Sequence, residues 1–141
     1  YQIMFRRSPL EQYGNVQHDA RAEFATAHAK TLLLFDGAID YIGVARQAIT
    51  RSDYELKGKM ISKSIAVVNG LKDCLDLSHG ELPRNLCDLY EYIVETLFKA
   101  NLTSDLEAIE EVQRLLKTVR ESWAQIPSDV HQVSSNKNYQ K

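Results

Sequence analysis

Cysteine, proline and glycine are scarce in this sequence. The 141 residues include two Cys, three Pro and six Gly. Cys74 and Cys87 form neither a disulfide framework nor a Cys-x-x-Cys pair, which excludes a fold stapled by disulfides. Both lie inside apolar patterns, so we expect small buried side chains with free thiols and a cytoplasmic protein. The few glycines form no phosphate-binding loop.

Long apolar runs and an excess of one charge are also absent. No run approaches the roughly 20 apolar residues that a membrane-spanning helix needs. The 17 basic and 19 acidic residues give a net charge of −2, without blocks of like charge. We therefore expect neither a nucleic-acid footprint nor insertion into a membrane. The first residues, YQIMFRRSP, do not resemble a signal peptide.

Motifs of catalysis and metal binding are missing as well. Helical bundles that hold di-iron sites carry Glu-x-x-His on two helices, and the sequence contains no such motif. Gly-x-Ser-x-Gly and a plausible Cys-His nucleophile pair are also absent. His18, His79 and His131 fall in predicted loops or tails. We expect no enzyme and no metal or other cofactor.

His28 is the one residue for which we weigh a specific chemistry. A histidine on a bundle helix, followed by Lys30, could accept a phosphoryl group as histidine phosphotransfer domains do. The surrounding AHAKTLLLFDG lacks the small residues that usually follow the Lys-Gly of that family. A surface histidine in a first helical turn is the favoured interpretation.

The segment LLLFDGAIDY, Leu32 to Tyr41, could be a hairpin or a helix. Asp-Gly between apolar runs is a strong hairpin signal. However, Asp36, Asp40, Gly43 and Gln47 line up at helical spacing as one narrow polar stripe. A hairpin would give these polar residues no consistent face. We therefore predict a helix.

Four segments have helical periodicity. The first runs from about 27 to 51 with Thr26 as its N-cap, and the second from about 54 to 76. The third runs from about 82 to 101, with Pro83 in its first turn. The fourth begins with a Ser104/Glu107 capping box and ends before Pro127.

The short connections predict that sequential helices are antiparallel neighbours. The expected fold is all-α: an antiparallel up-down four-helix bundle with an N-terminal arm or short extra helix. We assign residues 1–25 to a partly flexible arm, with a possible short helix around 16–24. Residues 26–126 form the predicted bundle, and the polar, aperiodic residues 127–141 a disordered tail.

The apolar arcs of the first two helices are wider than a surface helix needs. The arc of the first covers about two-thirds of its circumference, whereas about 100° usually suffices. Two explanations stay open. Bundle neighbours could cover the helix on both sides, or part of the arc could be a groove for a partner.

Several segments together resemble the FliS family of flagellin export chaperones. They are LLFDGAI near Leu33, ISKSIAVVNGLKDCLD, GELPRNLCDLYEYI and ANLTSDLEAIEEVQRLLKTVRESW. The match extends in order from Tyr13 to Trp123. Each motif alone is weak, but the combination is specific. One departure is that TAHAK stands where family members usually begin the first long helix with a pair such as Ser-Pro.

This resemblance implies a cytoplasmic chaperone that requires no nucleotide or metal. Family members bind the C-terminal region of flagellin, prevent its premature polymerisation and help deliver it to the flagellar type III export gate. An aliphatic residue and a tyrosine in the family's N-terminal arm correspond by position to Leu10 and Tyr13. Tyr13 could act in handling the partner and the export gate, or it could be an aromatic anchor that holds the arm on the bundle. A flagellar regulatory protein is a further possible partner.

A chaperone that blocks the assembly of flagellin must cover the apolar surface of the guest helix. This requirement favours helix-in-groove recognition. We expect the guest on the flanking stripes of the first two helices, where small residues such as Gly37 would admit its backbone. The candidates are Leu34, Ala38, Tyr41, Ala45, Met60, Val67 and Leu71. A second hypothesis is a four-helix adaptor that tethers signalling or regulatory proteins.

Overall fold

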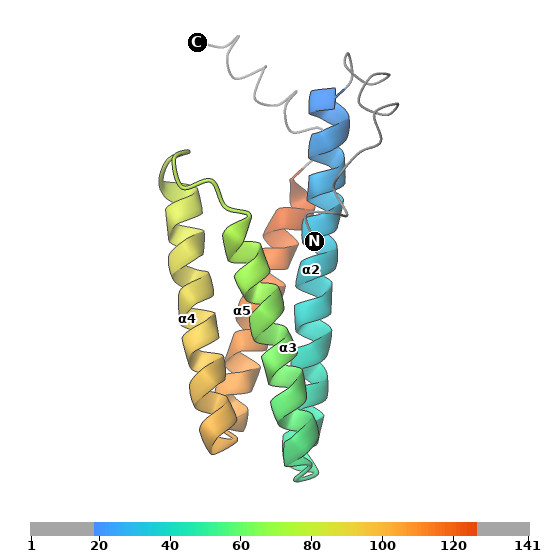
Figure 1. The fold of residues 1–141 in the computed structure, drawn as a ribbon, viewed down its shortest axis with the longest axis vertical. Coiled ribbons are helices and arrows are strands. Elements are labelled where there is room, and N and C mark those ends of the chain that lie inside the picture. Colours follow the sequence, from blue (N-terminus) through green and yellow to red (C-terminus); the bar gives the residue numbers. More distant parts are fainter. Residues whose placement is uncertain (1–18, 127–141) are drawn as a thin grey trace. The chain divides into compact units, whose positions relative to one another are not determined.

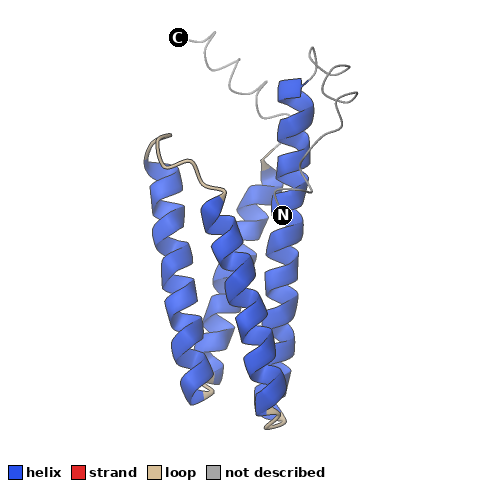
Figure 2. Ribbon diagram, in the orientation of Figure 1, coloured by secondary structure: helices blue, strands red, loops and turns tan. Residues whose placement is uncertain are grey.

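The computed structural model describes the backbone of residues 19–126 and the side chains of residues 25–126. This part of the chain is helical and contains no strand (Figure 2). Its helices are α2 (Asp19–Thr50), α3 (Tyr54–Asp73), α4 (Glu81–Thr103) and α5 (Leu106–Gln125). The expected all-α bundle of four helices is confirmed.

The chain divides into two compact units, one of Tyr1–Lys30 with Ile126–Lys141 and one of Thr31–Gln125. The second holds the four-helix core. In the first, only residues 19–30 and Ile126 are described; 19–30 are the first turns of α2. The limits assigned to the arm, the bundle domain and the tail stay a prediction, and residues 127–141 lie outside the described part.

Within Thr31–Gln125 the helices follow one another around a core (Figure 1). The ammonium of Lys63 on α3 lies 5.6 Å from the centre of the Tyr41 ring on α2. Lys72 of α3 pairs with Glu91 of α4, and the Tyr92 hydroxyl of α4 donates to Glu111 of α5. Hydrogen bonds from α5 to α2 close the ring, so α2 and α4 are diagonal partners.

The core consists of one cluster of buried apolar side chains from all four helices. The Phe35 and Tyr90 rings meet across it, with centroids 6.4 Å apart and planes tilted by 53°. Its members are Phe35, Ala38, Ile42, Ala45, Met60, Ile61, Val68, Leu71, Tyr90, Ile93, Leu97, Ala100, Ile109, Val112 and Leu116. Trp123 and Val119 pack against it from α5.

Three predicted helix ends are wrong. The first long helix begins at Asp19, so Thr26 is an interior residue and not an N-cap. Residues 19–26, rich in alanine, are good helix formers and continue the same helix. The second helix ends at Asp73, three residues before the predicted end. Glu81 begins α4, which leaves Pro83 in its first turn as predicted.

The Ser104/Glu107 capping box is the third wrong prediction. Asp105, one residue later, caps α5 by accepting the amide N–H of Ala108 at 3.2 Å. Ser104 instead ends α4 in a left-handed conformation, with φ of 54°. Its hydroxyl accepts a hydrogen bond from the buried Lys57 of α3 at 2.8 Å, and the same ammonium donates to the Asn101 carbonyl at 2.9 Å. A lysine from a neighbouring helix thus satisfies the end of α4.

Candidate partner-binding surface

The predicted groove residues lie on the α2–α3 side of the core. Leu34 and Tyr41 of α2 and Val67 of α3 are half-buried and pack against the core cluster. Leu10 and Tyr13 lie outside the described residues. Four further candidates are buried members of the core: Ala38, Ala45, Met60 and Leu71. A guest can touch these four only if the helices separate, so the accessible part of the predicted groove is Leu34, Tyr41 and Val67.

Burial by neighbouring helices therefore explains much of the wide apolar arc of α2. Phe35, Ala38, Ile42 and Ala45 all belong to the core. Gly37 lies beside open space, because a Cβ built there meets nothing within 4 Å among the described residues. Close approach of a guest to Gly37 stays a prediction.

Polar contacts close the seam between α2 and α5. The Arg120 guanidinium donates from Nε to Asp36 Oδ1 at 2.8 Å and from a terminal nitrogen to Oδ2 at 3.4 Å. About two turns further along α5, Arg46 donates to Gln113 Oε1 at 2.7 Å. Gln113 in turn donates to the Ile39 carbonyl at 3.4 Å. Asp36 of the polar stripe and the nearby Arg46 thus face polar partners on α5.

Exposed apolar side chains are concentrated on α4. Phe98 is 58% exposed and Leu102 85% exposed, and Tyr92 and Leu82 are also exposed. Leu82 lies in the first turn of α4 and is 66% exposed. The other large exposed apolar side chains among the described residues are Leu33, Val44, Tyr54 and Leu77.

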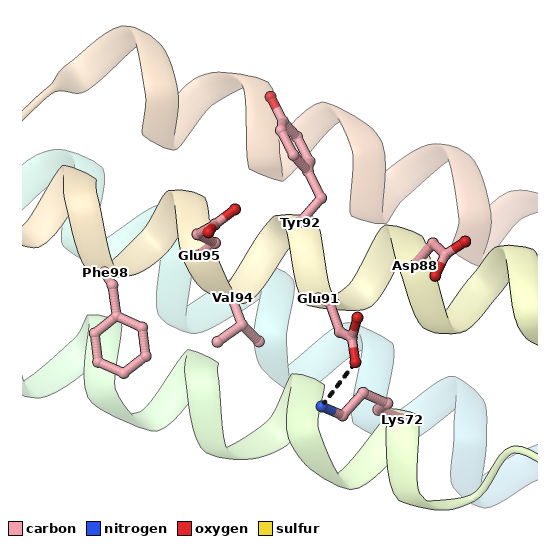
Figure 3. A pocket seen from close by; sticks show the side chains of 7 residues that line it. All are labelled: Lys72, Asp88, Glu91, Tyr92, Val94, Glu95 and Phe98. Carbon is pink, nitrogen blue, oxygen red and sulfur yellow. Dashed lines mark ion pairs between the residues drawn. The ribbon is translucent and has the colours of Figure 1, made fainter.

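An open pocket of about 470 Å³ lies on this side of α4. Figure 3 shows Val94 and Phe98 pointing toward α3, and Tyr92 on the opposite flank of the helix. Lys72 of α3 reaches across to Glu91, with Nζ 3.7 Å from the carboxylate. Asp88 and Glu95 complete the lining with negative charge. The surface thus combines an apolar row with an acidic border.

Reactive chemistry is not supported by the cysteines or by His28. Cys74 is exposed, contrary to the expected burial, because it follows the end of α3. Partial burial, and then the carboxylate of Glu91, raise the pKa of Cys87, which keeps this thiol protonated. His28 is an interior helical residue and is only 6% exposed, not the expected surface residue of a first turn. That burial makes its imidazole inaccessible to a phosphodonor protein.

Metal binding and membrane spanning concern two further features of the described residues. No cluster of three or more His, Cys, Asp or Glu suited to a metal ion occurs among them. None of the described helices is long and apolar enough to cross a membrane.

Comparison with known proteins identifies the family. Residues 9–130 match the family described as flagellar protein FliS. A flagellar secretion chaperone FliS of Salmonella typhimurium is 38% identical over 87% of this chain and 93% of its own length. The chaperone FliSB of Pseudomonas aeruginosa is 35% identical over 85% of this chain and 96% of its own. The flagellar secretion chaperone FliS of Bacillus subtilis is 30% identical over 72% of this chain and 75% of its own length.

The relatives carry the names of chaperones, which agrees with the expectation that the protein is not an enzyme. The family match covers the motifs from Tyr13 to Trp123 on which the resemblance rests. Family match, identity and helical bundle agree, and the chain belongs to the FliS family of flagellar proteins.

Proposed function

We propose that this protein is a cytoplasmic chaperone of flagellar export. It binds the C-terminal region of flagellin, prevents premature polymerisation and assists delivery to the type III export apparatus. The observation that carries this proposal is the similarity, over most of both chains, to relatives named flagellar secretion chaperones. The exposed apolar side chains of the bundle supply surface for such a guest.

Calorimetric titration with flagellin tests the proposal directly. Full-length flagellin should bind tightly, with a negative heat-capacity change from burial of apolar surface. Flagellin without its C-terminal region should not bind. If neither form binds, the family membership reports only fold, and the four-helix adaptor becomes the better hypothesis.

We propose that one part of the predicted groove, the seam between α2 and α3, contributes to binding of the guest. Leu34, Tyr41 and Val67 present half-buried apolar surface there. Val67→Arg should weaken flagellin binding while the circular dichroism stays helical. Ala66→Arg is the matched control, because Ala66 is the exposed neighbour of Val67 on α3. Equal binding by both variants would remove this seam from the site.

Ala38→Arg is not a useful test of the groove. Ala38 is fully buried, so an arginine there would place an unpaired charge in the core and unfold the bundle. Loss of binding by that variant would not distinguish a lost contact from a lost fold.

Leu10 and Tyr13 are proposed to act in the N-terminal arm, in handling the guest and the export gate. Tyr13→Ala should alter export in cells more than it alters bundle stability. Hydrogen exchange of residues 9–18 with and without flagellin provides the second measurement. Unchanged exchange would argue against a role of the arm in binding the guest.

A further inference from the structure

Two largely exposed apolar side chains, Phe98 and Leu102, lie one turn apart on α4, an arrangement found on no other helix among the described side chains. Val94, Phe98 and Leu102 are spaced four residues apart, and we call them the α4 strip. Val94 is half-buried, whereas Phe98 and Leu102 are largely exposed. Eight residues of helix place the ends of the strip about 12 Å apart. An amphipathic helix that docks lengthwise along α4 would contact side chains with this spacing.

Isolated exposed apolar residues are ordinary on protein surfaces, so the continuity of the strip matters. On α2 the exposed Leu33 and Val44 are eleven positions apart, or roughly 16 Å. The described part of α5 has no large exposed apolar side chain. The α2–α5 seam is occupied by polar contacts, as shown above.

The flank of α3 beside the strip extends from Gly58 to Lys72. Gly58 lies opposite Asn101, and a Cβ built on Gly58 would be 3.9 Å from the Asn101 side-chain oxygen. Lys72, at the other end of this flank, contacts Glu91. The pocket of Figure 3 lies between, with Val94 and Phe98 in its lining.

Charge indicates what kind of guest fits this surface. Asp88, Glu91 and Glu95 border the pocket, while Lys72 is its single basic lining residue. Lys72 pairs with Glu91, and no ion pair within residues 25–126 joins Asp88 or Glu95 to a basic side chain. A guest with lysine or arginine beside its apolar row would complement these carboxylates.

We propose that the α4 strip docks an amphipathic helix of the exported cargo, with basic residues facing Asp88 and Glu95. The inference rests on the proposed chaperone function and adds to it a location and a guest chemistry. The proposed docking surface lies on α4, which is diagonal to α2. It is separate from the α2–α3 seam.

Phe98→Glu against Leu33→Glu is the decisive comparison. Phe98 and Leu33 are 58% and 69% exposed and lie on diagonal helices, so both variants should fold. Calorimetric titration with full-length flagellin should show at least tenfold weaker binding by Phe98→Glu and less than a twofold change for Leu33→Glu. Circular dichroism and thermal unfolding establish that both variants are intact.

The remaining outcomes are distinct from one another. If wild type does not bind flagellin, the proposed function fails. If wild type binds and Phe98→Glu binds equally well, the chaperone function stands and the α4 strip is overturned as its docking surface. Light scattering tests whether a second copy of the chain occupies the strip. If wild type is a dimer and Phe98→Glu is a monomer with unchanged affinity for flagellin, the proposal is also overturned.

The proposed pairing of basic guest residues with Asp88 and Glu95 has its own test. The double variant Asp88→Asn with Glu95→Gln should bind flagellin several-fold more weakly at low ionic strength. The difference from wild type should vanish at about 1 M salt, where the Debye length is about 3 Å. The pair Glu107→Gln and Glu121→Gln on α5 removes the same charge away from the strip and should have little effect. Equal weakening by both pairs would mean that net charge, and not the border of the strip, attracts the guest.

Discussion

Arg120 of α5 holds Asp36 of α2 by two hydrogen bonds, of 2.8 Å and 3.4 Å. The hydrogen bonding to Asp36, and then its charge, raise the pKa of Arg120. This ion pair explains how an aspartate fits within the apolar segment LLLFDGAIDY. Its carboxylate projects to the polar seam, while Phe35 beside it enters the core.

A double-mutant cycle on Arg120→Ala and Asp36→Ala should show a favourable coupling, because the guanidinium meets the carboxylate at two points. The coupling should shrink toward zero at about 1 M salt, since both side chains are partly exposed. Urea unfolding measures it. The Arg46/Glu110 pair, joined at 3.7 Å, is the matched cycle and should show weaker coupling. Equal couplings would mean that the two-point geometry contributes nothing.

Lys57→Met should lower the free energy of unfolding by about 1–3 kcal/mol, because it leaves the Asn101 carbonyl and the Ser104 hydroxyl without their donor. Lys59→Met, on the exposed face of the same helix, should change it by less than about 0.5 kcal/mol. Chemical denaturation gives both values. A small loss for Lys57→Met would show that water replaces the ammonium at the end of α4.

Gly37→Ala and Gly43→Ala form a matched pair on α2. A Cβ at Gly37 meets nothing within 4 Å, so alanine should stabilise the helix by about 0.5–1 kcal/mol. At Gly43 the Cβ would lie 3.3 Å from Gln113 Nε2, so the gain should be smaller or reversed. Thermal unfolding compares the two. If a guest backbone approaches Gly37, that variant should also bind flagellin less tightly despite its greater stability.

Leu97→Ala and Leu102→Ala separate packing from docking on one helix. Leu97 is fully buried, so its truncation should cost about 2–5 kcal/mol of stability. Leu102→Ala should change stability by less than about 0.5 kcal/mol and weaken flagellin binding. Denaturation and titration of both variants provide the measurements. A large loss of stability for Leu102→Ala would contradict its exposure.

Burial, and then the nearby Cys74, raise the pKa of Tyr90 to about 12. A tyrosine in an unfolded chain titrates near 10, so folding strengthens proton binding at Tyr90. Its contribution to stability is therefore complete below pH 10 and is lost as the pH rises through about 12. Tyr90→Phe should lose less stability than wild type over this interval, measured by denaturation at each pH. Parallel losses in both proteins would assign the alkaline transition to other groups.

Helical periodicity was enough to predict the fold class and most of each helix. The polar stripe through Asp36 correctly distinguished helix from hairpin, and Pro83 correctly marked a first turn. Sequence motifs were also enough to predict the family, because their order and spacing survive without knowledge of contacts. The helix ends were less accurate, since Asp105 and Ser104 are both competent caps and the chain path decides between them.

Local sequence pattern was sufficient for the number of long helices, for the interior of each helix and for the family. Which apolar residues form the core and which lie on the surface depends instead on how the helices pack against one another. Periodicity fixes the direction of a side chain about its own helix axis, but burial depends on which neighbouring helix covers that direction. Ala38 and Met60 are covered, whereas Phe98 and Leu102 are not. Lys57 likewise has a partner because α4 happens to end beside it.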